Sequence, residues 1–275
     1  MKTKIFAVLI ALLALTSVFA QGSGEQQPRT RTAGGAYTIE VGGSTSVTPL
    51  MELLAAEYAK VKPNIKVNIN GTGSGDGINN TGVLYQIGMS SRELTPVEQG
   101  KGLKETVIAI DGIAVIVNKS NTVDNLTLEQ IRNIYIGSIN NWSQVGGKNA
   151  PIAVVSREEG SGTRGAFEEI ARFQGKLLAN ANQLTSTGAI LANIAQNPDA
   201  IGYISLGSLN DTIKAVSVNG VAATSANVVK GTYKIARPFI VLTGKNIHSE
   251  SSAFIQWMLS PAGQKVVSKS WIPVK

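Results

Sequence analysis

The residues that could do chemistry together lie in one short run, Ser156 to Arg164, which combines arginines, carboxylates, hydroxyls and glycines. The apolar residues 152–155 before this run predict a strand, and residues 166–173 after it predict a helix. A strand, a polar turn and a helix in this order leave backbone N–H groups unpaired at the helix N-terminus, where the macrodipole also favours negative charge. The run therefore predicts an anion-binding site.

Four residues of this run are candidate donors to the anion. Arg157 offers a guanidinium, Ser161 and Thr163 offer hydroxyls, and Gly162 offers a backbone N–H. Arg164 could contact the anion, or it could brace Glu159 or the rim of the binding cleft. The plainer interpretation is that the hydroxyls only cap the helix and that Arg157 is a surface residue paired with the next carboxylate, Glu158.

Turns of the same kind follow three other predicted strands, at 37–41, 65–69 and 87–90. Ligands of α/β proteins sit at the carboxyl ends of strands, so the polar residues of these turns are further candidates. They are Thr45 and Ser46 in the first turn, Ser74 and Asp76 in the second, and Ser90 and Ser91 in the third. Asp76 could instead cap the helix that it precedes.

The repeated order of strand, turn and helix predicts an α/β fold with parallel strands. Thr48 followed by Pro49 predicts a helix start, with Leu50, Leu53, Leu54, Tyr58 and Val61 on one helical face. A weaker helix is expected after the second turn, ending at about residue 85, and further helices are expected at 126–136, 189–197, 251–259 and 261–268. Further strands are expected at 106–118, 201–204, 216–218 and 239–242.

Two apolar strands, at 113–117 and 239–242, stand on either side of a self-contained α/β stretch. If the chain crosses to a second lobe at the first and returns at the second, the molecule has two lobes with the anion held between them. We expect lobe 1 to comprise 37–115 and 236–275, and lobe 2 to comprise 116–235.

Residues 1–20 have the layout of a cleavable signal peptide, with Lys2 and Lys4 before an apolar run that is too short for a membrane span of about 20 residues. Residues 21–36 are rich in Gly, Gln and Thr and are typical of a flexible leader. We therefore expect a periplasmic or secreted protein, and not a lipoprotein, because the chain has no Cys.

The inventory of side chains argues against several classes of protein. With no Cys and a single His, His248, neither a Ser-His-Asp triad nor a metal site built on several histidines is expected, and no cofactor is expected either. Without Lys2 and Lys4 the basic count falls from 25 to 23 against 18 acidic residues. This small excess is spread along the chain, so no nucleic-acid partner is expected.

Eight sequence features in one order resemble the periplasmic phosphate-binding proteins of bacterial phosphate ABC importers. They are GSTS at 43–46, GSG at 73–75, IGMSSREL at 87–94, Trp142, REEGSGTR at 157–164, GYI at 202–204, RPF at 237–239 and LSPAGQ at 259–264. The resemblance implies a bilobed periplasmic-binding-protein fold of type II that closes on inorganic phosphate and delivers it to membrane permease subunits, as a monomer and not as an enzyme. It implies as ligands Thr45, Ser46, Ser74, Ser91, Arg157, Glu159, Ser161, Gly162 and Thr163.

The chain departs from this family at one position. Well-known members carry an aspartate after the third strand, where it accepts the proton of the phosphate, and here Ser91 stands in its place. Glu159 or Asp76 would have to supply that acceptor. A buried carboxylate would distinguish phosphate from sulfate, because an acceptor that faces another acceptor costs roughly 1–3 kcal/mol.

Three other functions stay open on the residues alone. The ligand could be another tetrahedral oxyanion, such as sulfate, molybdate, tungstate or a phosphonate. The same donors could serve a phosphate-ester hydrolase, although no His cluster, Cys or group of Asp residues supports one. A structural or adhesive role would predict no affinity for small anions.

Overall fold

The computed structural model describes residues 36–274. The predicted signal peptide, and all but the last residue of the predicted leader, lie outside the described residues. None of the helices within 36–274 is long and apolar enough to cross a membrane.

Nine strands of the described chain form one sheet in the order β2, β1, β3, β11, β4, β8, β6 and β7, with β9 also paired to β4. Strand β1 pairs in parallel with β2 and β3, and β6 pairs in parallel with β7 and β8. Strands β4 and β11 are antiparallel to each other, and β4 is also antiparallel to β8 and β11 to β3. The α/β prediction is confirmed. The strands are β1 (Tyr37–Gly43), β2 (Ile65–Gly71), β3 (Ile87–Ser90), β4 (Lys104–Asn118), β6 (Ala153–Arg157), β7 (Asn182–Leu184), β8 (Ala200–Ser205), β9 (Ile213–Ala215) and β11 (Ala236–Thr243).

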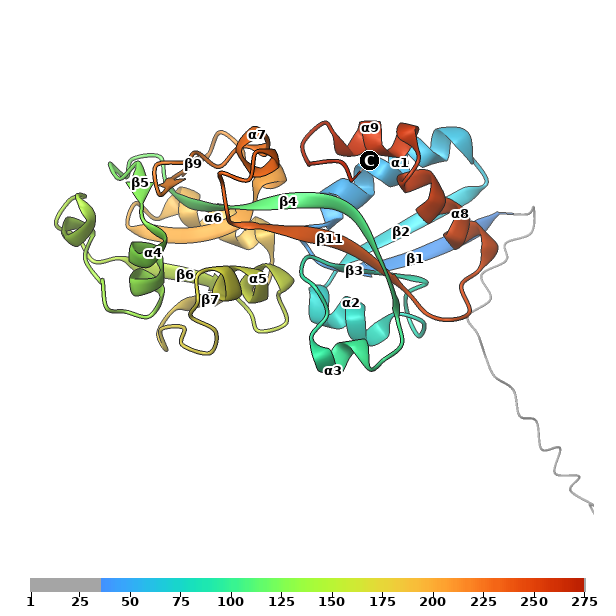
Figure 1. Cartoon of the computed structure of the whole chain (residues 1–275), viewed down its shortest axis with the longest axis horizontal. Coiled ribbons are helices and arrows are strands. Elements are labelled where there is room, and N and C mark those ends of the chain that lie inside the picture. Colours follow the sequence, from blue (N-terminus) through green and yellow to red (C-terminus); the bar gives the residue numbers. More distant parts are fainter. Residues whose placement is uncertain (1–35, 275) are drawn as a thin grey trace, which may run out of the picture. The chain divides into compact units, whose positions relative to one another are not determined.

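Helices follow most of these strands (Figure 1). They are α1 (Thr48–Val61), α2 (Ser74–Asn80), α3 (Pro96–Gln99), α4 (Leu128–Tyr135), α5 (Gly162–Ile170), α6 (Thr187–Gln196), α7 (Ser225–Val229), α8 (Ser249–Met258) and α9 (Pro261–Val267). Two 3-10 turns, Trp142–Val145 and Leu206–Ser208, and a separate two-stranded sheet of β5 (Asn125–Leu126) and β10 (Ser217–Val218) complete the described elements.

One hydrophobic core combines the beginning and the end of the described chain. It packs β1, α1, β2 and β3 against α8, α9 and the first part of β4, with Leu50, Phe239 and Phe254 at 0% exposure. Apolar residues from both ends of the chain thus bury each other, which removes more apolar surface from water than either segment could remove alone.

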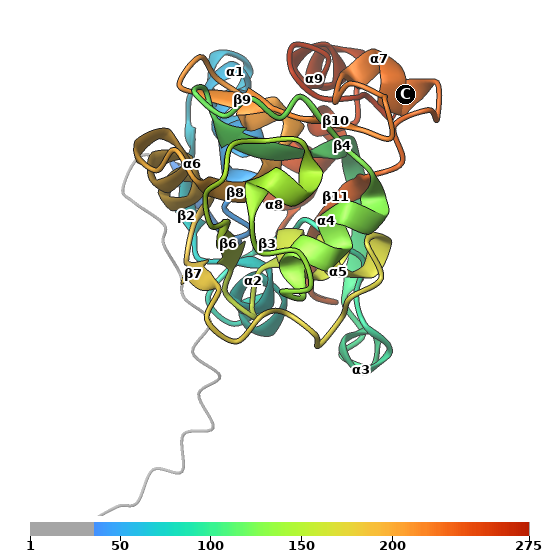
Figure 2. The ribbon, with the colours of Figure 1, turned by 90° about the vertical axis from the view of Figure 1, so that its left-hand side faces the viewer.

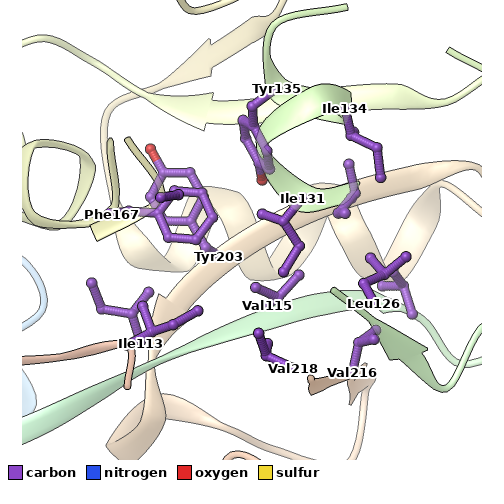
Figure 3. Packing of buried hydrophobic residues seen from close by; sticks show 14 of the residues in the cluster. Ile113, Val115, Leu126, Ile131, Ile134, Tyr135, Phe167, Tyr203, Val216 and Val218 are labelled. Atoms are coloured by element: carbon purple, nitrogen blue, oxygen red, sulfur yellow. The ribbon is translucent and has the colours of Figure 1, made fainter. Parts of the chain in front are cut away.

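The middle of the chain forms a second core, on one face of β4, β6 and β8. Phe167 of α5 stacks here on Tyr203 of β8, and Tyr135 of α4 meets Phe167 edge to face. Ile113 and Val115 of β4 belong to the same cluster (Figure 3). On the opposite face of these strands α6 covers a smaller cluster, and Figure 2 shows α6 and the pair α4 and α5 on either side of β8 and β6. Both faces of this part of the sheet are therefore buried, because helices cover the sheet on either side.

The structure corrects the predicted start and buried face of α1. Val47 occupies the N-cap position without a side-chain hydrogen bond, so Thr48 is the first helical residue and not the cap. Leu53 and Val61 are 40% and 59% exposed, and Met51 is buried in their place. The apolar stripe is therefore rotated from the predicted one, because α1 packs not only on β2 but also against α8 and α9, which lie about 200 residues further along the chain.

Other helix boundaries also differ from those predicted. Helix α2 ends at Asn80 and not near residue 85, α4 begins at Leu128 behind a capping box of Thr127 and Gln130, and α5 begins at Gly162. The short helices α3 and α7 and the strand β7 were not predicted. The earlier start of α5 matters most, because it turns residues of the polar run into the first turn of a helix.

Candidate anion-binding site

The N-terminus of α5 is the centre of the candidate site. Ser161 is the N-cap, and its Oγ accepts a hydrogen bond from the backbone N–H of Arg164 at 3.3 Å. The N–H groups of Gly162 and Thr163 come before the first intrahelical hydrogen bond and have no acceptor within the helix. Ser161 therefore caps the helix, while the next two residues direct backbone donors outward at its positive end.

Hydroxyl groups of the turn between β1 and α1 lie against this helix end. Ser46 Oγ is 2.7 Å from Thr163 Oγ1 and 3.2 Å from Thr187 Oγ1, and Thr45 Oγ1 is 3.4 Å from Thr187 Oγ1. Ser46, Thr163 and Thr187 are buried. Four hydroxyls from three separate turns thus form one connected group.

The turns after β2 and β3 contribute a second pair of hydroxyls next to Gly162. Ser74 Oγ lies 3.3 Å from Ser91 Oγ and accepts the Ser91 backbone N–H at 3.2 Å. A Cβ atom on Gly162 would lie 2.4 Å from Ser74 Oγ and 2.8 Å from Ser91 Oγ. Position 162 therefore has no room for a side chain, which explains its glycine by contact and not by backbone conformation.

Arg157 is the buried cation of the candidate site. It ends β6, its side chain is 3% exposed, and both oxygens of Glu158 accept hydrogen bonds from it at 2.9 Å. The carbonyl oxygens of Leu184 and Thr185 accept two more. The alternative interpretation of Arg157 as a surface residue is therefore wrong, because the side chain is buried. The pairing with Glu158 that this interpretation included is present.

The two carboxylates of the loop differ in their surroundings. Glu158 bonds to Arg157, and its Oε1 lies 3.3 Å from the position that a Cβ of Gly73 would take. Glu159 is exposed, and no hydrogen bond or ion pair is found for its carboxylate among the residues the structure describes. Glu158 is therefore the carboxylate that is tied to the buried arginine, and a buried carboxylate is not found at Glu159.

Asp76 and Ser90 are held by local contacts. Asp76 accepts hydrogen bonds from Thr72, Asn80 and Tyr85 at 2.5, 2.6 and 2.9 Å. Burial alone would raise the pKa of Asp76, but these hydrogen bonds outweigh it and lower the pKa, so this carboxylate is ionised near neutral pH. Ser90 Oγ donates to the Arg92 carbonyl within its own turn.

Arg164 braces the loop from the far side of the helix end. Its Nε donates to Glu168 at 2.6 Å, and its Nη1 donates to the Arg157 carbonyl and to the side chain of Gln183. The carboxylate that it braces is thus Glu168, one turn along α5, and not Glu159. Arg164 fixes the backbone of Arg157 and thereby the end of β6.

Sequence reasoning missed Thr187, the first residue of α6. Its hydroxyl and its backbone N–H both contact the turn of Thr45 and Ser46. Ser186, Thr187 and Gly188 before an apolar helix form a polar start like that of α5, so the signal was present. Within residues 36–274 no three His, Cys, Asp or Glu side chains are grouped as a metal site would require.

Comparison with known proteins agrees with this fold. Residues 25–262 match the family described as the PBP superfamily domain. A solved structure from Clostridium perfringens, a putative phosphate ABC transporter substrate-binding protein with bound phosphate, is 44% identical, with a TM-score of 0.85 over 87% of this chain and 100% of that one. An ABC-type phosphate transport receptor from Vibrio cholerae is 35% identical, with a TM-score of 0.71 over 86% of this chain and 100% of that one.

A curated relative points to a narrower group of proteins. The phosphate-binding protein PstS of Borreliella burgdorferi is 31% identical over 84% of this chain and 88% of its own length. The chain therefore belongs to the PBP superfamily, and within it to the family of the PstS phosphate-binding proteins. The predicted type of fold is confirmed by this membership.

Proposed function

We propose that this chain binds inorganic phosphate outside the cytoplasmic membrane and delivers it to an ABC-type importer. Its relatives are named phosphate-binding proteins, and the solved structure from Clostridium perfringens holds phosphate. The function is binding and transport and not catalysis.

The observation that carries this proposal is the meeting of hydroxyls with N–H groups that have no acceptor within the helix, at the start of α5. Ser46, Thr163 and Thr187 come from segments far apart in the chain and are buried together. Hydroxyls both donate and accept hydrogen bonds, so they suit an anion that still carries a proton. The N–H groups of Gly162 and Thr163 add donors that cannot be deprotonated.

Arg157 would provide the charge that opposes the anion. The contacts of its Nε and Nη2 with Glu158 and two carbonyl oxygens hold the guanidinium in one position before the ligand arrives. Nη1 has no hydrogen-bond partner among residues 36–274, which leaves its two N–H groups for phosphate. A prepositioned donor loses little side-chain entropy when phosphate binds.

We assign the phosphate contacts to Thr45, Ser46, Ser74, Ser91, Arg157, Ser161, Gly162 and Thr163, and we add Thr187. For the proton of the phosphate, Glu158 is a better candidate than the exposed Glu159, because it lies beside Arg157. We assign Arg164 to support of the loop.

We also propose that the two hydrophobic cores are two lobes that close on phosphate. Residues up to Ala109 of β4 belong to the first core and residues from Ile113 belong to the second, so the crossing falls between them, slightly before the predicted boundary at 115. On the return the change falls between Ile235 and Phe239. Bending at these two strands would be hinge closure.

A calorimetric titration with phosphate and with sulfate tests the proposed function. We expect tight binding of phosphate that excess sulfate does not displace, in the mature chain without residues 1–20. Tight sulfate or molybdate binding with weak phosphate binding would contradict the choice of ligand. Metal-dependent hydrolysis of a phosphomonoester would contradict the transport function.

Export, the transporter and the oligomeric state complete the proposal. A signal peptide at 1–20 would bring the chain out of the cytoplasm, and the importer's membrane subunits would be its partners. We expect the protein to act as a monomer. Size-exclusion chromatography with light scattering, with and without phosphate, tests the last point.

A further inference from the structure

A buried ion pair joins the two strands that connect the cores. Asp111 of β4 and Arg237 of β11 stand directly opposite each other in the antiparallel register. Asp111 Oδ2 lies 3.1 Å from Arg237 Nη2, and the two side chains are 1% and 2% exposed. Ser205 at the end of β8 donates to Asp111 Oδ1 at 2.9 Å.

The hydrogen-bond donors of Arg237 are only partly paired. Its Nε and Nη1 are buried and have no hydrogen-bond partner among the described residues, so three N–H donors are unpaired. A buried donor without a partner costs roughly 1–3 kcal/mol, and such exceptions call for an explanation. The ring of Phe239 lies 5.3 Å from the guanidinium carbon and compensates in part.

The pair is close to the candidate site. Ser205 and Tyr203 are two residues apart on β8, so their side chains share a face about 7 Å apart. The phenol oxygen of Tyr203 accepts the backbone N–H of Arg157 at 3.2 Å and lies 2.8 Å from Ser156 Oγ. The buried pair is therefore linked through one strand to the backbone of the arginine that we assign to phosphate.

Charges around the pair can be named from each element that packs against it. Asp111 faces Arg237 of β11, the hydroxyl of Ser205 and the backbone N–H of Gly207. Burial lowers the pKa of Arg237, Asp111 raises it, and repulsion by Arg157 lowers it further. Burial raises the pKa of Tyr203 to about 12, so this phenol is neutral.

We propose that Arg237 is a second cationic group of the phosphate site, which acts through its field, and that Asp111 offsets part of its charge. This inference rests on the proposed function. The positive charge of Arg237 would attract the bound anion without touching it. When no ligand is bound, the carboxylate of Asp111 would reduce the repulsion between the buried side chains of Arg157 and Arg237. Arg237 thus acts on the bound anion through its charge and does not contact it.

Removal of the two charges should have opposite effects on affinity. Asp111→Asn keeps the shape of the side chain but exposes the field of Arg237, so phosphate should bind about threefold or more tightly. Arg237→Gln removes the favourable field and should weaken binding about tenfold, a change of about 1.4 kcal/mol, because a charge in a medium of intermediate dielectric constant acts on an anion beyond contact distance. A merely structural pair predicts weaker binding in both variants.

The experiment is a phosphate titration of wild type, Asp111→Asn, Arg237→Gln, Arg237→Lys and the double variant with Asn at 111 and Gln at 237, at pH 8 and pH 5. We expect Lys at 237 to retain most of the affinity. Burial raises the pKa of Asp111 to about 6, so the difference between wild type and Asp111→Asn should shrink at pH 5, where the wild-type carboxyl is protonated.

The outcomes separate this inference from the proposed function. If wild type binds phosphate but Asp111→Asn and Arg237→Gln both weaken binding equally at both pH values, the inference is wrong and the function stands. If wild type does not bind phosphate, the function itself is wrong. If a single variant does not fold by circular dichroism, the double variant and Arg237→Lys decide: the inference requires weaker binding in the double variant and near wild-type binding with Lys.

Discussion

Ser46 and Thr163 place their hydroxyl oxygens 2.7 Å apart although 117 positions separate them in the chain. Ser46 belongs to the turn after β1, and Thr163 belongs to the first turn of α5. Their contact joins the two parts of the chain that build the two hydrophobic cores. Substitutions of residues near this contact test the proposed phosphate site.

Arg157→Ala should weaken phosphate binding at least tenfold. A charge-assisted hydrogen bond is worth roughly 1.5–3 kcal/mol, and the variant also leaves Glu158 without its partner. Isothermal titration calorimetry measures the change, and Arg157→Lys is the matched control, which keeps the charge but loses the paired geometry. An unchanged affinity in the alanine variant would place the anion elsewhere.

Glu158→Gln should weaken phosphate binding several-fold, whereas Glu159→Gln should change it by less than about twofold. The first variant removes the carboxylate that orients Arg157, and the second alters an exposed side chain. Both variants are titrated with phosphate and sulfate. If sulfate binding appears only in Glu159→Gln, Glu159 is the carboxylate that accepts the proton of phosphate and excludes sulfate.

Gly162→Ala should reduce phosphate binding at least tenfold. The added methyl group would lie 2.4 Å from Ser74 Oγ, so the hydroxyl pair or the helix end must move. Gly160→Ala is the matched control in the same loop, because nothing lies within 4 Å of its Cβ position. Equal binding by the two variants would show that the close approach at Gly162 has no role in the site.

Thr187→Val should weaken phosphate binding about fivefold, and Thr187→Ser should bind like wild type. The valine keeps the shape but loses the hydroxyl that contacts Ser46 and Thr45, a loss of about 1 kcal/mol. Stopped-flow fluorescence of phosphate release shows whether the change lies in dissociation. Identical behaviour of both variants would remove Thr187 from the assigned contacts.

The free energy of unfolding should fall as pH rises from about 4 to about 6, and ionisation of Asp111 should account for part of this fall. Burial raises the pKa of Asp111 to about 6, so the folded state holds a proton that the unfolded state, with an ordinary carboxyl, has released. This stabilisation is complete below pH 4 and lost above pH 6. In Asp111→Asn the same pH interval should show a smaller loss, measured by urea unfolding. Parallel curves for both proteins would contradict the raised pKa.

The sequence by itself determined the type of fold and the chemistry of the polar turns. Strands followed by turns rich in Gly, Ser and Thr repeat along the chain, and this local pattern predicts parallel strands with donors at their ends. Ser46, Ser74, Ser91 and Thr163 could be chosen as candidates on this basis. Their types are a local property, which the residues themselves carry.

Only the tertiary structure decided which of these groups meet. The burial of Arg157 against the carbonyl oxygens of Leu184 and Thr185, the inclusion of Thr187 and the rotation of the buried face of α1 depend on segments that are distant in sequence. The burial of Asp111 against Arg237 depends on the register of two strands that begin 132 positions apart, at Lys104 and Ala236. Burial and charge pairing are properties of the packed chain, because they are set by neighbours that no local pattern specifies.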